Sequence, residues 1–150
     1  GGMALAAGFG QSGLAAWIGE QMSLLDGFRL LFIMVLVTAA VNFLTEVTSN
    51  LATASMLMPI LASLGVAMGV HPYALMVPAI LAASCAFMLP VATPPNAVVF
   101  GSEVIVMRDM IRAGFRMNLL SILLISLYVA ALLPLFWGID LYELPAAFRP

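Results

Sequence analysis

The stretches Thr45-Glu46-Val47-Thr48-Ser49-Asn50 and Ala92-Thr93-Pro94-Pro95-Asn96 decide the fold of this chain. They lie near the two ends of a run, from Val47 to Ser102, that contains no Asp, Glu, Lys or Arg and is otherwise mostly apolar. In hydrocarbon, an unpaired backbone N–H or C=O group is very unfavourable, so non-helical backbone persists only where protein buries it or where it lines a polar cavity. The sequence therefore predicts a membrane protein whose helices break at two places, and such breaks indicate a binding site.

The composition supports a bilayer environment and excludes several classes of function. Hydrophobic residues make up 64% of the 150 residues and charged residues 8%, with a mean hydropathy of +1.16, whereas soluble domains are about 25% charged. All five basic residues are Arg and the net charge is -2, so no nucleic-acid-binding surface is expected. The single cysteine, Cys85, is expected to be a packing residue. No metal cluster, phosphate loop or nucleophile–base pair indicates an enzyme.

The first half of the chain predicts a partial helix in residues 1–25 and a helical hairpin in residues 26–70. The first arm of the hairpin has 16 residues between Arg29 and Glu46, about 24 Å of helix, which is shorter than the ~30 Å hydrocarbon core. A cytoplasmic loop would be expected to carry Lys or Arg, but the tip of the hairpin has neither. We therefore expect a re-entrant hairpin that ends inside the membrane.

The second half predicts a discontinuous transmembrane helix in residues 73–106 and a last span in residues 117–139. In the discontinuous helix, the apolar run from residue 73 to residue 89 is expected to be helical and residues 90–96 to be the break, with Asn96 as the N-cap of the helix that follows. The last span has 23 residues without a charge, which matches the ~20 residues that a spanning helix needs.

The arginines predict the orientation in the membrane. Arg108, Arg112 and Arg116 precede the last span, whereas Asp140 and Glu143 follow it. Because positive residues are enriched on the cytoplasmic side, we expect an integral protein of the cell (inner) membrane with its C-terminus outside, on the periplasmic side.

The first break offers ligands for both a cation and an anion. Thr45, Thr48, Ser49 and Asn50 supply hydroxyl and amide oxygens, and the turn frees backbone carbonyl groups. The second arm begins beside Ser49, Asn50 and Leu51, where a helix N-terminus carries an effective charge of about +0.5. Oxygens for a cation beside N–H groups for an anion are typical of secondary transporters.

The second break is expected to repeat this arrangement. Pro94 and Pro95 cannot donate hydrogen bonds, which leaves upstream carbonyl groups free, including that of Ala92.

Glu46, in the first break, has two open interpretations: a functional intramembrane carboxylate or a partner for an Arg near a helix end.

Both stretches resemble the divalent-anion/sodium symporter (DASS) family, which carries dicarboxylates, citrate or sulfate. Phe43-Leu44-Thr45-Glu46-Val47-Thr48-Ser49-Asn50-Leu51-Ala52-Thr53 is similar to the second Ser-Asn-Thr hairpin motif of the family. Phe87-Met88-Leu89-Pro90-Val91-Ala92-Thr93-Pro94-Pro95-Asn96-Ala97-Val98-Val99-Phe100-Gly101-Ser102 is similar to its long signature on the following broken helix. The resemblance extends from residue 1 to about residue 139 and covers only the C-terminal half of such a transporter.

The resemblance implies one repeat of an inverted-repeat transporter, an N-terminal half as its partner, a homodimer, and elevator-type movement. It implies that Na⁺ is bound by Thr45, Thr48, Asn50 and Ala92, and the anion by Ser49, Asn50, Leu51, Thr93 and Pro94, with no other metal. Leu51 stands where the family motif has threonine. This loss of a hydroxyl leaves the choice among succinate, citrate and sulfate open.

The expected function is sodium-coupled symport of a di- or tricarboxylate or a similar divalent anion. Two alternatives remain. An ion channel can also build its filter from a broken helix and exposed carbonyl groups. A non-transporting membrane subunit would use the polar stretches only to bond neighbouring helices.

Overall fold

The computed structural model describes residues 11–13 and 29–148, and within this part of the chain every regular element is a helix. In order, the helices are α3 (Arg29–Leu44), α4 (Asn50–Ala67), α5 (Tyr73–Ala83), α6 (Pro94–Gly101), α7 (Met107–Trp137) and the short 3-10 helix η1 (Ala146–Phe148). The prediction of an all-α protein is confirmed. The partial helix expected in 1–25 lies outside the described residues, except for 11–13.

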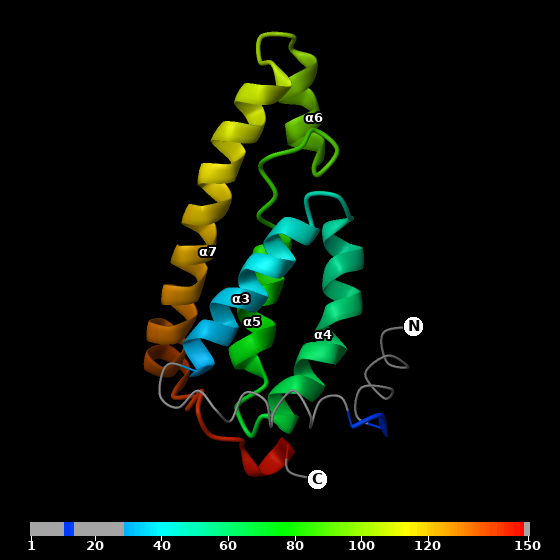
Figure 1. The fold of residues 1–150 in the computed structure, drawn as a ribbon. Coiled ribbons are helices and arrows are strands. Elements are labelled where there is room, and N and C mark those ends of the chain that lie inside the picture. Colours follow the sequence, from blue (N-terminus) through cyan, green and yellow to red (C-terminus); the bar gives the residue numbers. More distant parts are fainter. Residues whose placement is uncertain (1–10, 14–28, 149–150) are drawn as a thin grey trace.

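Helices α3 and α4 form a hairpin through a turn at residues 45–49 (Figure 1). Both arms pack against α5, which lies between them. The turn lies part-way along the length of α7 in Figure 1, not beside either end of it. α3 has 16 residues, so it is about 24 Å long.

Helix α5 ends earlier than the sequence predicts. It stops at Ala83, with Ser84 as its C-cap, and residues 84–93 are irregular. The expected helix from residue 73 to residue 89 is therefore wrong in its last turn and a half, and the break begins well before Pro90. Residues 85–89 are apolar and contain no helix breaker, so the local sequence gives no signal for this end.

Helix α7 begins ten residues before the span expected at residues 117–139. It has 31 residues, about 46 Å of helix, which exceeds the ~30 Å hydrocarbon core. It ends at Trp137, because Gly138 adopts the left-handed conformation (φ 61°) of a C-terminal cap. The helical part of the expected span is therefore 117–137.

One face of α7 is buried and carries residues at spacings of four and three. They are Met110, Gly114, Asn118, Ile122, Ser126, Val129 and Leu133. The opposite face exposes large apolar side chains, among them Leu120, Leu123, Leu124 and Leu127. An exposed apolar face of this extent is typical of a surface that meets lipid or other protein.

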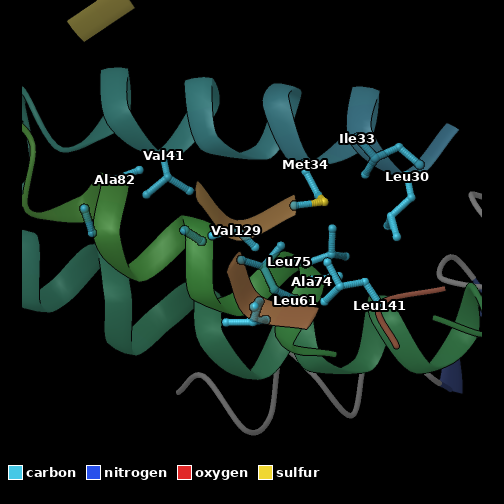
Figure 2. Packing of buried hydrophobic residues seen from close by; sticks show 13 residues of the cluster. Leu30, Ile33, Met34, Val41, Leu61, Ala74, Leu75, Ala82, Val129 and Leu141 are labelled. Carbon is cyan, nitrogen blue, oxygen red and sulfur yellow. The ribbon is translucent and has the colours of Figure 1, made fainter. Parts of the chain in front are cut away.

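The hydrophobic core lies where α3, α4, α5 and α7 meet (Figure 2). Met34 of α3, Leu75 of α5 and Val129 of α7 are almost fully buried at its centre. α5 contributes small residues, Ala74, Ala79, Ala82 and Ala83, which let its neighbours approach closely. The core thus fixes the hairpin and the end of α5 relative to α7.

A close contact fixes the other end of the hairpin. A Cβ atom at Gly65 would lie 2.9 Å from the Cα atom of Pro72, so only glycine fits where α4 turns into α5. The His71 N–H donates to the Leu141 carbonyl at 3.2 Å. The turn between α4 and α5 therefore contacts the segment after α7.

Two of the described helices are long and apolar enough to cross a membrane, Asn50–Ala67 and Met107–Trp137. The helices α3 and α5 are apolar but shorter. These lengths agree with an integral membrane protein, in which the short helices need other elements to complete their spans.

Candidate functional site

The turn at residues 45–49 leaves the N-terminus of α4 without a side-chain cap. Ser49 is the N-cap residue, with φ -68° and ψ 133°, and its hydroxyl accepts no hydrogen bond from the helix. The first turn of α4 contains no acidic residue. Because the first N–H groups of a helix have no partner within it, this end is suited to bind an anion.

Oxygen atoms converge on the inner side of the same turn. The hydroxyl of Thr45, which is fully buried, lies 2.5 Å from Oδ1 of Asn50 and 2.9 Å from the carbonyl oxygen of Ala83. A hydroxyl has a single proton, so it can donate to only one of these two oxygens at a time. The cluster of three oxygens matches the preference of a hard cation such as Na⁺.

Thr48 lies in the turn but points elsewhere. Its hydroxyl donates to the Leu44 carbonyl at 2.8 Å and lies 2.6 Å from the hydroxyl of Thr53. The hydroxyl of Thr53 in turn donates to the Ser49 carbonyl at 3.0 Å. Since these hydroxyl groups satisfy the turn itself, any ligand role of Thr48 would fall to its backbone carbonyl group.

The irregular segment after α5 is bonded mainly to the hairpin; within the segment, the Ala92 N–H donates to the Leu89 carbonyl at 3.2 Å. Asn42 of α3 donates from Nδ2 to the Cys85 carbonyl at 2.6 Å, and the carboxylate of Glu46 accepts the N–H groups of Phe87, Met88 and Leu89 at 2.8–3.1 Å. These partners satisfy backbone groups that would otherwise be unpaired in an apolar environment. They explain why α5 ends at Ala83.

Both interpretations of Glu46 from the sequence change with this geometry. Within the described residues its carboxylate pairs with no Arg; it accepts hydrogen bonds from backbone N–H groups and from Nδ2 of Asn118 at 2.8 Å. Among the described residues, these donors take the place of the Arg partner that one interpretation expected. The side chain is buried, with 3% of its surface exposed, in a cage of N–H donors.

Helix α6 begins at Pro94, so its N-cap is not Asn96. Thr93 is the N-cap, and its hydroxyl accepts the N–H of Asn96 at 3.4 Å. The expectation of Asn96 as N-cap is therefore wrong by three residues, because Pro94 and Pro95 fit the first helical turn, where no N–H is needed. Asn96 instead donates from Nδ2 to the carbonyl groups of Ala86 and Leu89, at 2.9 and 3.1 Å.

The two breaks consequently differ in chemistry. At α6 the prolines have no N–H and that of Asn96 is already bound, so this helix start offers few free donors. Within the described part of the chain, the carbonyl group of Ala92 accepts no hydrogen bond. The start of α4 supplies N–H groups, and the second break supplies a free carbonyl and the hydroxyl of Thr93.

The structure brings some of the expected ligands together and leaves others apart. Thr45 and Asn50 are in direct contact. Ser49, Leu51 and Pro94 are exposed, Leu51 to 77%, as is required of groups that meet a ligand or another part of the protein. No hydrogen bond among the described residues joins 92–94 to 45–51. Residues 83–89 connect the two groups.

Sequence reasoning missed three residues that support the site. They are Asn42 on α3 and, on α7, Gly114 and Asn118. A Cβ atom at Gly114 would lie 2.3 Å from the Phe87 carbonyl oxygen, so the irregular segment touches the helix backbone there. The spacing of four between a glycine and an asparagine, on one face of an otherwise apolar helix, is a signal that could have found the last two.

A transition-metal site is not formed by the described side chains. Within 11–13 and 29–148, no group of three or more His, Cys, Asp or Glu residues is placed to hold a metal ion. The oxygen cluster at Thr45 and Asn50 instead offers hydroxyl, amide and carbonyl oxygens.

Comparison with known proteins gives consistent results. The model of the sodium:sulfate symporter transmembrane region matches residues 1–141. The chain is 56% identical over 143 residues to the sodium-dependent dicarboxylate transporter SdcS of Staphylococcus saprophyticus, and 54% identical to that of Staphylococcus aureus strain MRSA252. These matches cover 95% of this chain but 28% of each relative.

The family and the relatives are transporters, which confirms the expectation that this protein is not an enzyme. The match extends over α3 to α7 and includes both breaks. The chain belongs to the sodium:sulfate symporter family, which is the divalent-anion/sodium symporter family that its two motifs resemble.

Proposed function

We propose that this chain forms the C-terminal repeat of a sodium-coupled symporter for dicarboxylates, tricarboxylates or a similar divalent anion. Its family and the names of its relatives support this class of substrate. The observation that carries the proposal is the direct bonding between two broken helices: in the hairpin turn, Thr45 bonds the last carbonyl group of α5 and Glu46 binds the backbone after α5. Two such breaks side by side are the usual site of ion and substrate in secondary transporters.

The sodium ion is bound by Thr45, Thr48, Asn50 and Ala92. The contact between the Thr45 hydroxyl and Oδ1 of Asn50 supports this assignment. The carbonyl group of Ala92, which accepts no hydrogen bond among the described residues, also supports this assignment. Thr48 takes part through its backbone carbonyl, because its hydroxyl is bonded within the turn.

The anion is bound by Ser49, Asn50, Leu51, Thr93 and Pro94. The uncapped start of α4 supports this site, since its N–H groups and its positive end attract a carboxylate. Leu51 is apolar and exposed, so this side of the site recognises the hydrocarbon part of a dicarboxylate better than it does a hydroxyl group.

In the membrane, residues 26–70 form a re-entrant hairpin, residues 73–106 a discontinuous helix and residues 117–139 the last span, with the partial helix of 1–25 before them. The short α3 and the position of the hairpin turn part-way along α7 support this arrangement (Figure 1). The protein lies in the cell membrane with its C-terminus outside.

The complete transporter pairs this repeat with an N-terminal half in inverted orientation, and two copies form a homodimer. Sodium binds first, neutralises the oxygen cluster and orders the turn, so that the start of α4 can accept the anion. Elevator-type movement then carries the loaded site across the membrane. One net positive charge moved across 100 mV releases about 2.3 kcal/mol, so an excess of sodium over substrate charge drives accumulation.

The test is uptake of labelled succinate by the full-length transporter in liposomes, with and without an inward sodium gradient. Saturable uptake that rises with the gradient is expected. Uptake that does not respond to sodium would refute the proposal.

The alternatives give different results in the same preparation. A channel would carry continuous single-channel current without saturable exchange. For a non-transporting subunit, alanine at Asn50 and Thr93 would alter assembly and leave any flux unchanged.

A further inference from the structure

Glu46 is the only described side chain that binds three consecutive residues of the irregular segment. Its Oε1 accepts the N–H groups of Phe87 at 2.8 Å and Met88 at 3.0 Å, and Nδ2 of Asn118 at 2.8 Å. Its Oε2 accepts the N–H groups of Met88 and Leu89, both at 3.1 Å. These bonds join the hairpin turn, the irregular segment and α7 at one carboxylate.

A carboxylate fits this position better than any other group. All of its neighbours are donors, and a carboxylate offers only acceptors. An amide at the same place would turn its own N–H groups toward backbone N–H groups. Hydrogen bonds to a charged acceptor are also stronger than neutral ones, so the carboxylate holds the segment firmly.

The segment is held from two sides. On the side of α7, Gly114 leaves room for Phe87 and Met88 to touch the helix backbone. Asn118, one turn further along the same face, binds the carboxylate. Removal of the carboxylate would free the backbone of Phe87 and its neighbours from the hairpin turn while the contact with α7 remained.

Direct binding of sodium by Glu46 does not fit these contacts. Both carboxylate oxygens are occupied by N–H donors, and the side chain is 3% exposed. The oxygen cluster at Thr45 and Asn50 involves the carbonyl of Ala83 and not this carboxylate.

We propose that Glu46 is a positioning residue for the transport site. It holds residues 87–89 against the hairpin turn, and these lead directly to Ala92, Thr93 and Pro94. The bonds from Glu46 therefore set the distance between the ligands on the second break and those on the turn. One carboxylate thus positions ligands for both sodium and the anion. The proposal rests on the proposed function, since it needs both groups of ligands to act on one site.

The experiment uses the full-length transporter in liposomes with three variants. Glu46→Gln removes the carboxylate, Asn118→Ala removes one of its donors, and Glu103→Gln removes an exposed carboxylate as the matched control. Succinate uptake is measured against sodium concentration and, at saturating sodium, against succinate concentration. Maximal rates are divided by the amount of folded protein.

For Glu46→Gln we expect the half-saturating concentrations of both sodium and succinate to rise about tenfold, as is common when a group that orients metal ligands is removed. The maximal rate per folded protein should stay near that of the wild type. Asn118→Ala should show a smaller rise of both values, and Glu103→Gln none. If Glu46→Gln does not fold, Asn118→Ala decides by the same criterion.

Two other patterns would overturn the proposal. A purely electrostatic role of the carboxylate would weaken sodium but strengthen succinate binding, so the two values would move in opposite directions. A merely structural role would reduce the amount of folded protein without changing either value. If wild-type uptake does not respond to sodium, the proposed function fails, and the half-saturating succinate concentration of the variants still decides the role of Glu46.

Discussion

Replacement of Gly114 by alanine tests the contact between α7 and the irregular segment. The added Cβ atom would lie 2.3 Å from the carbonyl oxygen of Phe87, 2.5 Å from its carbonyl carbon and 2.6 Å from the Cα atom of Met88. All three are backbone atoms, so no side-chain rotation can relieve the overlap. The segment has to move by about 1 Å to restore ordinary contact distances.

The expected loss of stability follows from this displacement. Overpacking of this kind costs about 1–3 kcal/mol. A shift of about 1 Å also distorts its bonds to Glu46, whose useful range is narrow, and one lost bond to a charged group costs about 1.5–3 kcal/mol. Alanine gains about 1 kcal/mol of helix propensity over glycine. The net loss for Gly114→Ala is therefore roughly 1.5–5 kcal/mol.

In the assay, the purified full-length transporter in detergent is denatured either by heating or by titration with sodium dodecyl sulfate. Gly101→Ala is the matched control, because it is also a helical glycine and no atom lies within 4 Å of its added Cβ. We expect Gly114→Ala to unfold several degrees below the wild type and Gly101→Ala to be unchanged or slightly more stable.

One result would refute the reasoning. If Gly114→Ala is as stable as Gly101→Ala and has an unchanged half-saturating sodium concentration, the segment does not lie against α7. In that case α7 would not hold the second break in place.

Two further predictions concern the turn and the opposite end of the hairpin. Thr45→Val keeps the shape of the side chain but removes its bond to the Ala83 carbonyl, so we expect about 1–3 kcal/mol lower stability. The half-saturating sodium concentration in uptake should also rise. Thr48→Val should leave the sodium dependence of uptake nearly unchanged. Burial lowers the pKa of His71 from its ordinary value of 6.5, and its Nδ1 accepts the N–H of Tyr73 at 3.2 Å. The unfolded chain therefore takes up a proton first as the pH falls, so stability is complete above about pH 6.5 and decreases below it until the folded protein also protonates; denaturation midpoints of the wild type should show this dependence, and those of His71→Asn should lack it.

Much of the architecture could be predicted because its signals are local. The short first arm of the hairpin was visible as 16 residues between Arg29 and Glu46, and α3 has this length. The position of Ser49 at the start of α4 follows from residue preferences at helix ends.

The errors have two causes. The end of α5 at Ala83 and the partners of Glu46 depend on bonds between distant residues. The start of α6 at Pro94, with Thr93 as its N-cap, is a local feature that the expectation of Asn96 overlooked, because prolines suit the first helical turn. The sequence around residues 84–89 is apolar and compatible with a helix. It is irregular because the side chains of Asn42 and Glu46 bind its backbone.

The membrane environment and the positions of the two polar breaks follow from the amino-acid order alone. Composition determines whether a surface is compatible with lipid. A polar break inside an apolar run costs free energy unless other groups or a ligand satisfy it, so both features are visible in the local sequence. Only the tertiary structure decided which groups meet. Glu46 and its backbone partners are 41 to 43 residues apart, and Asn118 is 72 residues away. Hydrogen bonds act over about 3 Å, so such pairs exist only after α3, α5 and α7 have packed together.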